Sequence, residues 1–110
     1  MATDNSLSPD EEPRRSTLDA LTDPILLEFG ATWCGYCQAA QPLIAAALEQ
    51  YPDLSHMRIE DGPGRRLGRS FHVKLWPTLI LMHQGSELAR LVRPTSSDEI
   101  IAALAHLRQP

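Results

Sequence analysis

The sequence predicts an α/β domain, in which a central mixed sheet of four strands, with room for a weak fifth, carries helices on both faces. A strand-like apolar run over residues 25–29 is followed by an Ala- and Leu-rich helical run over residues 38–50. Two further strand-like runs flank Gln84-Gly85, which is typical of an antiparallel hairpin. An apolar stripe at helical spacing then predicts a helix near the end of the chain.

The size and charge of the chain narrow the possible classes of protein. The 110 residues suffice for one domain with a single core, and the formal net charge of −4 gives no reason to expect a nucleic-acid partner. No apolar run approaches the roughly 20 residues of a membrane span. Residues 1–13 are rich in Ser, Asp, Glu and Pro, so we expect a mobile tail before a folded domain over 14–110. Because this start is unlike a secretory signal, we expect a cytoplasmic protein.

The first half of the domain alternates between helix and strand. Ser16 is expected to cap a short helix that reaches about Leu21, before Asp23-Pro24 ends it. The strand over residues 25–30 is apolar on both faces apart from one carboxylate, as expected for a covered central strand. Pro42 should bend the helix that follows.

The second half supplies the remaining strands. Residues 56–60 are a plausible strand, and a turn and a short helix to about Phe71 follow it. The hairpin strands are expected over 79–82 and 88–92. Ser96 and Glu99 have the spacing of a capping box, so the last helix should begin there.

The only two cysteines, Cys34 and Cys37, lie where the first long strand turns into its helix. Residues at i and i+3 share one helix face. A helix N-terminus offers unpaired N–H groups and the positive end of the helix dipole, and both favour a thiolate at Cys34. A thiolate is the attacking species in disulfide exchange, and Cys37 is placed to resolve a mixed disulfide. The pattern therefore predicts a redox-active dithiol.

Two interpretations stay open around this dithiol. A Cys-x-x-Cys is also half of a zinc site, but the chain has no second cysteine pair, so such a site would have to be shared between two chains. Glu28, in the strand before the motif, is either a strand-end carboxylate in water or a partly buried carboxylate beneath the dithiol. In the second case it accepts the Cys37 proton and is a catalytic residue.

Four short segments together resemble the thioredoxin family over about residues 16–108. Residues 29–37, with the sequence FGATWCGYC, resemble the active-site strand and turn of the family, and Pro42 falls where the family bends its active-site helix. Trp76-Pro77-Thr78 resembles its cis-proline loop, and residues 84–86 resemble its final hairpin turn.

This resemblance implies a thioredoxin fold and dithiol–disulfide exchange with protein substrates. Cys34 would be the nucleophile, Cys37 the resolving cysteine and Pro77 the cis-proline that faces them. Glu28 occupies the position of a buried Asp in the family. No metal or organic cofactor is implied, so electrons would come from a partner reductase or a small thiol.

Several residues depart from the family pattern at the expected substrate surface. Tyr36 replaces a proline between the cysteines, Trp76 replaces a smaller residue before the cis-proline, and Arg93 replaces a glycine. The first strand of the family pattern is not visible, because the segment over residues 7–11 cannot pair well with a central strand. The expected substrate-binding residues are Trp33, Gly35, Tyr36, Trp76, Pro77 and Arg93.

These observations favour a small monomeric protein that reduces protein disulfides. One alternative reverses the direction of electron flow and makes the protein a disulfide oxidase or isomerase in an oxidising compartment. The other is a thioredoxin-fold binding module whose dithiol senses the redox state. The reduction potential distinguishes a reductase from an oxidase or isomerase. Activity on a generic disulfide distinguishes a reductase from a binding module.

Overall fold

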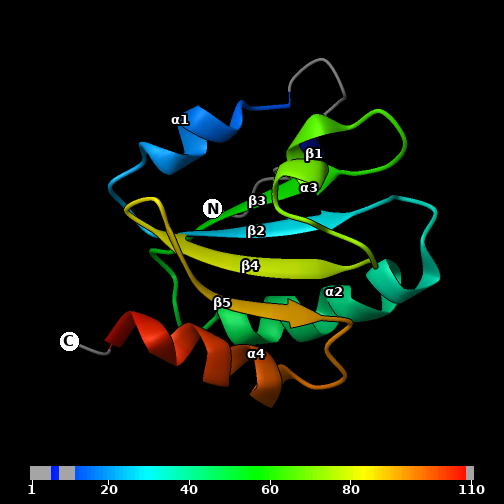
Figure 1. The fold of residues 1–110 in the computed structure, drawn as a ribbon. Coiled ribbons are helices and arrows are strands. Elements are labelled where there is room, and N and C mark those ends of the chain that lie inside the picture. The colour runs from blue at the N-terminus through cyan, green and yellow to red at the C-terminus, as the bar shows by residue number, and fades with distance from the viewer. Residues whose placement is uncertain (1–5, 8–11, 109–110) are drawn as a thin grey trace.

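The structure, a computed structural model, describes residues 6–7 and 12–108 and forms a five-stranded sheet in the order β1-β3-β2-β4-β5 (Figure 1). The strands are β1 (Ser6–Leu7), β2 (Ile25–Gly30), β3 (Ser55–Glu60), β4 (Thr78–His83) and β5 (Ser86–Val92). The helices are α1 (Arg15–Asp19), α2 (Gly35–Leu48), α3 (Arg66–Ser70) and α4 (Ser97–Leu104), and a 3-10 turn over Ala105–Arg108 follows α4. The predicted α/β class with a mixed sheet is confirmed.

Strand β2 lies at the centre of the sheet. It runs parallel to β3, with Glu28 opposite Arg58, and antiparallel to β4. The predicted hairpin joins β4 to β5 through Gln84 and Gly85, whose φ angles are 53° and 81°. A two-residue turn with positive φ at both positions matches the twist of the flanking strands. The hairpin therefore forms where the sequence predicts it.

Strand β1 is the weak fifth strand for which the sequence left room. Ser6 pairs with Arg58 and Leu7 with Ile59, so β1 extends the parallel part of the sheet at the edge beside β3. The prediction that the segment beginning at Leu7 cannot pair is therefore wrong at Leu7, because this pairing needs only the backbone of two residues, which composition does not reveal. Residues 1–5 and 8–11 of the expected tail lie outside the described residues. Closer to the domain, the Glu12 carboxylate accepts a hydrogen bond from the Leu67 N–H at 3.0 Å.

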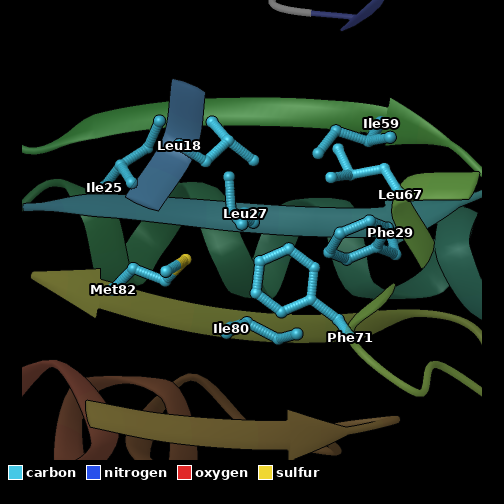
Figure 2. Packing of buried hydrophobic residues seen from close by; sticks show 9 residues of the cluster. All are labelled: Leu18, Ile25, Leu27, Phe29, Ile59, Leu67, Phe71, Ile80 and Met82. Carbon is cyan, nitrogen blue, oxygen red and sulfur yellow. The ribbon is translucent and has the colours of Figure 1, made fainter. Parts of the chain in front are cut away.

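The two faces of the sheet carry different helices because side chains alternate along each strand. On one face, α1 and α3 cover the odd-numbered apolar residues of β2 together with Ile80 and Met82 of β4 (Figure 2). Phe29 and Phe71 meet there with ring centres 5.5 Å apart. On the other face, α2 and α4 cover Leu26 and its neighbours in β4. The expectation of helices on both faces is confirmed.

Helices α2 and α4 pack together on the face that carries the cysteines. The Ser96 hydroxyl accepts a hydrogen bond from the Glu99 N–H at 3.2 Å, as the capping-box pattern predicts. The Glu99 carboxylate, however, returns to the Thr95 N–H at 2.7 Å. Ser97 then donates its hydroxyl to the Leu43 carbonyl of α2 at 3.0 Å. In the described part of the chain, no helix is long and apolar enough to cross a membrane.

Candidate active site

The two cysteines lie at the start of α2, where the chain leaves β2. Cys34 is the N-cap of α2, and its sulfur accepts a hydrogen bond from the Cys37 N–H at 3.2 Å. Both are free thiols and both are buried, with exposed fractions of 7% and 5%. The first turn of one helix thus holds both sulfurs, as the spacing predicts.

The surroundings of Cys37 keep its thiol protonated. Burial raises the pKa of Cys37 from its ordinary value of 9.0 to about 12, and the hydrogen bond with the Cys34 sulfur adds to this shift. A hydrogen bond with the backbone of Ala31 opposes the shift, while the charges of Cys34 and Glu28 reinforce it. Cys37 therefore needs a proton acceptor before it can act as a nucleophile.

Gly30 has no side chain and therefore leaves room for the Cys37 sulfur. A Cβ on Gly30 would lie 2.6 Å from Cys37 Sγ, which is closer than side-chain atoms approach one another in proteins. The sulfur consequently rests against the bare backbone at the end of β2. A glycine that ends a strand just before the cysteine motif was the available sequence signal, and sequence reasoning missed it.

Glu28 lies on the sheet face that α2 covers and is only 4% exposed. Its carboxylate accepts a hydrogen bond from Gln41 Nε2 at 2.6 Å, and it lies 2.8 Å from His56 Nε2 and 3.8 Å from Arg58 Nε. The interpretation as a strand-end carboxylate in water is therefore wrong, whereas the interpretation as a buried carboxylate agrees with the structure. Gln41 also donates to the Cys37 carbonyl at 3.1 Å, so one side chain holds both the carboxylate and the turn that carries the thiol.

A small cavity connects the carboxylate to the resolving thiol. It has a volume of about 30 Å³, and both Glu28 and Cys37 line it. Such a volume can hold one or two water molecules, because a single water needs about 10–15 Å³ measured in this way. A water at that position can carry a proton from the Cys37 sulfur to the carboxylate.

The rim above the dithiol is aromatic. Trp33 and Tyr36 are 72% and 61% exposed, and the Trp33 ring meets the Trp76 ring edge to face with centres 5.5 Å apart. Trp76 Nε1 donates to Asp61 Oδ2 at 2.9 Å, which fixes the indole. The peptide bond between Trp76 and Pro77 is cis, as the resemblance implied.

Arg93 contacts both Tyr36 and the Trp76-Pro77 segment of this rim. It follows β5 with a φ of 52°, and its backbone N–H donates to the Pro77 carbonyl at 2.9 Å. Its Nε donates to the Trp76 carbonyl at 2.8 Å, and its guanidinium carbon lies 3.9 Å from the centre of the Tyr36 ring. Gly35 lies exposed beside Tyr36, and a Cβ there would meet nothing within 4 Å. Trp33, Tyr36, Trp76 and Arg93 are thus linked by direct contacts, and Trp76 packs against the two cysteines.

This combination of fold, dithiol and cis-proline loop can be compared with known proteins. The family model described as Thioredoxin matches residues 10–106 of the chain. The chain belongs to the thioredoxin family. Thioredoxin C-3 of Corynebacterium nephridii is 35% identical over 68 residues, which are 62% of this chain and 47% of that relative. Thioredoxin-1 of Saccharomyces cerevisiae is 32% identical over 83 residues, which are 74% of this chain and 81% of that relative.

The solved structures agree with this family. The structure of thioredoxin 2 from Pseudomonas aeruginosa PAO1 in its reduced form is 54% identical, with a TM-score of 0.79. That match covers 87% of this chain and 89% of the other. Thioredoxins are dithiol thiol–disulfide oxidoreductases, and the chain carries the corresponding Cys-x-x-Cys. The predicted family, fold and class of chemistry are therefore confirmed.

Within this thioredoxin-family site, sequence reasoning missed the residues that hold Glu28. Gln41 was within reach of sequence reasoning, because it lies one helical turn after Cys37 and shares its face. His56 and Arg58 were not, because their approach depends on the register that sets β3 beside β2.

Metal binding finds no support in the described residues. None of their His, Cys, Asp and Glu side chains forms a group of three or more that could hold a metal ion. Zinc sites generally require four ligands. The described residues of one chain therefore do not supply a complete zinc site around this thioredoxin-family motif.

Proposed function

We propose that this protein reduces disulfide bonds in polypeptide substrates through Cys34 and Cys37. The observation that carries the proposal is the cavity shared by Glu28 and a Cys37 thiol whose pKa is raised to about 12. A resolving cysteine that is held protonated beside a buried carboxylate suits the second step of dithiol exchange. We further propose that the protein acts as a monomer in a reducing compartment such as the cytoplasm.

In the first step, the Cys34 thiolate attacks one sulfur of the substrate disulfide. A bond forms between Cys34 Sγ and that sulfur, and the other substrate sulfur leaves as a thiolate. The substrate backbone lies beside Trp76 and Pro77, where an extended chain pairs in the manner of an added strand. Trp33, Gly35, Tyr36 and Arg93 complete the substrate-binding surface.

In the second step, Cys37 attacks the mixed disulfide. Its proton passes toward Glu28 through the shared cavity, and the resulting thiolate bonds to Cys34 Sγ. The remaining substrate sulfur leaves, and the protein ends as a Cys34–Cys37 disulfide. The two electrons that reduced the substrate are restored by a partner reductase or a small thiol.

Trapping of the mixed disulfide tests this assignment. Cys37→Ser should accumulate a covalent adduct with oxidised insulin, because Cys34 attacks but nothing resolves the adduct. Cys34→Ser should form none, and the wild type should form it only transiently. Mass spectrometry of non-reduced samples measures each species. Turnover by Cys37→Ser at the wild-type rate, without an adduct, would overturn the proposal.

A further inference from the structure

Arg93 is a cation fixed against Tyr36, the residue before Cys37, with part of its hydrogen-bonding capacity unused. Its Nε is engaged by the Trp76 carbonyl, and its flat face stacks on the Tyr36 ring. The two terminal nitrogens of a guanidinium in this orientation still form a fork that matches a carboxylate. Within the described residues, no carboxylate forms an ion pair with Arg93.

The fixed position of Arg93 matters as much as its charge. A non-glycine residue at a φ of 52° is uncommon, and here hydrogen bonds from both its backbone and its side chain to the Trp76-Pro77 segment hold it. Less side-chain freedom is lost when a preorganised guanidinium binds a ligand, so an ion pair formed there gains more than one with a mobile surface arginine.

A second group of basic residues lines a pocket that includes Asp61, the hydrogen-bond partner of the Trp76 indole. Arg65, Arg69, His72 and Lys74 line an open pocket of about 230 Å³ together with Asp61. The Asp61 carboxylate is engaged by Trp76 Nε1, so the pocket adjoins the same loop that Arg93 binds. Although the whole chain has a net charge of −4, positive charge gathers around this loop.

We propose that Arg93 determines specificity by selecting disulfide substrates that carry a carboxylate beside the cystine. The inference rests on the function proposed above, because the selected polypeptide is the one that lies along Trp76 and Pro77. An Asp or Glu next to the reacting sulfur meets the free fork of Arg93, and further acidic residues along the chain face the basic pocket. A substrate lysine beside the reacting sulfur is instead repelled by the fixed positive charge of Arg93.

Matched peptides test this selectivity. Three cystine peptides differ only in the residues beside the cystine, which are Asp, Asn or Lys. For the wild type we expect kcat/KM to favour the Asp peptide over the Asn peptide by about 5- to 10-fold at low salt, with the Lys peptide poorest. The preference should shrink as the ionic strength rises, because exposed ion pairs are screened.

Three variants test whether the preference depends on the guanidinium at position 93 or only on the net charge of the protein. Arg93→Gln should lower the Asp-to-Asn ratio to between one and two, whereas Arg93→Lys should keep an intermediate ratio because it retains the charge without the fork. Arg90→Gln is the matched control. It removes the same charge from β5, where Arg90 pairs with Glu87 at 2.8 Å, and should leave the ratio at the wild-type value.

A binding measurement keeps the inference separate from the proposed function. In Cys34→Ser/Cys37→Ser no exchange occurs, and both tryptophans of the chain lie on the rim, so their fluorescence reports peptide binding. Tighter binding of the Asp peptide without reduction of any peptide by the wild type would support the inference and overturn the proposed function. Equal binding and equal kcat/KM for all three peptides would overturn the inference and leave the function standing. A ratio that Arg93→Gln does not change would also overturn it.

Discussion

Cys34 and Cys37 are separated by two residues, yet their surroundings give the two sulfurs different tasks. The Cys34 sulfur is the cap of α2 and accepts a backbone hydrogen bond. The Cys37 sulfur lies between the end of β2 and a cavity that it shares with Glu28. The Cys34 sulfur is therefore stabilised as a hydrogen-bond acceptor, whereas Cys37 stays a thiol until its proton is removed.

Alkylation of the reduced protein should show this difference. Because burial raises the pKa of Cys37 to about 12, we expect iodoacetamide to modify Cys34 first and Cys37 only at strongly alkaline pH. Mass spectrometry of peptides after reaction at increasing pH locates each modification, and the unfolded protein serves as the control in which both react alike. Equal reactivity of the two sulfurs in the folded protein would contradict the assignment.

Glu28→Gln should slow the resolving step while sparing the first attack. The substitution keeps the size of the side chain but removes the proton acceptor, so we expect a loss of about 10- to 100-fold in resolution. Removal of the Glu28 charge also lowers the pKa of Cys37, which by itself would speed the step. Slower resolution would therefore point to the lost base.

Stopped-flow measurement of a preformed Cys34 mixed disulfide isolates that step. Glu49→Gln, at the exposed residue that follows α2, is the matched control and should behave as the wild type. Resolution by Glu28→Gln at the wild-type rate would remove Glu28 from the mechanism.

At the scale of elements, the junction between β2 and α2 is what brings the sulfurs and the carboxylate together. Gly30 ends the strand, Cys34 caps the helix, and Gln41 reaches from the second turn of the helix back to Glu28. Small changes in this junction should consequently alter the chemistry as well as the stability.

Gly30→Ala tests the junction. The added Cβ would lie 2.6 Å from Cys37 Sγ, so the sulfur or the strand must move. We expect a loss of about 1–3 kcal/mol in the free energy of unfolding, as overpacking typically costs, together with slower resolution. Urea denaturation of the reduced protein measures the stability. At Gly35 an added Cβ meets nothing within 4 Å, so Gly35→Ala should destabilise less, and an equal loss in both variants would contradict the explanation.

The elements also show what local sequence signals predict. The start of α4 could be predicted from the sequence because the Ser96 side chain caps the helix directly. The hairpin could be predicted because Gln84-Gly85 suits its two-residue turn. Strand β1 depends on two residues that pair at a sheet edge, and no local pattern predicts such pairing. His56 reaches Glu28 only because β3 pairs with β2 in one particular register. The cysteines were thus predictable from sequence, and the residues that position their proton acceptor were not.

At the scale of the whole molecule, the raised pKa of Cys37 links the site to folding. The unfolded thiol loses its proton near pH 9, whereas the folded thiol keeps it to about pH 12. The contribution to stability is therefore fully present below about pH 9 and is lost as the pH rises toward 12. Under reducing conditions the wild type should lose more stability between pH 8 and about 10.5 than Cys37→Ser does, as urea denaturation measures. Parallel losses in both proteins would contradict the link.

The direction of electron flow is also a property of the whole protein, because it reflects the relative stability of its reduced and oxidised forms. In the described residues, one backbone N–H bonds the Cys34 sulfur. A hydrogen bond to a charged group contributes about 1.5–3 kcal/mol, which corresponds to about 30–65 mV for this two-electron couple. That is well below the roughly 150 mV that separates thioredoxin from the strong oxidant DsbA. We therefore expect a reductase.

The reduction potential tests this central claim most directly. The protein is equilibrated with defined ratios of reduced and oxidised glutathione, and the fraction of Cys34–Cys37 disulfide is measured by mass spectrometry after acid quenching. We expect a value between about −270 mV, that of thioredoxin, and about −180 mV, that of protein disulfide isomerase. A value near −120 mV would contradict the account and make the protein an oxidase.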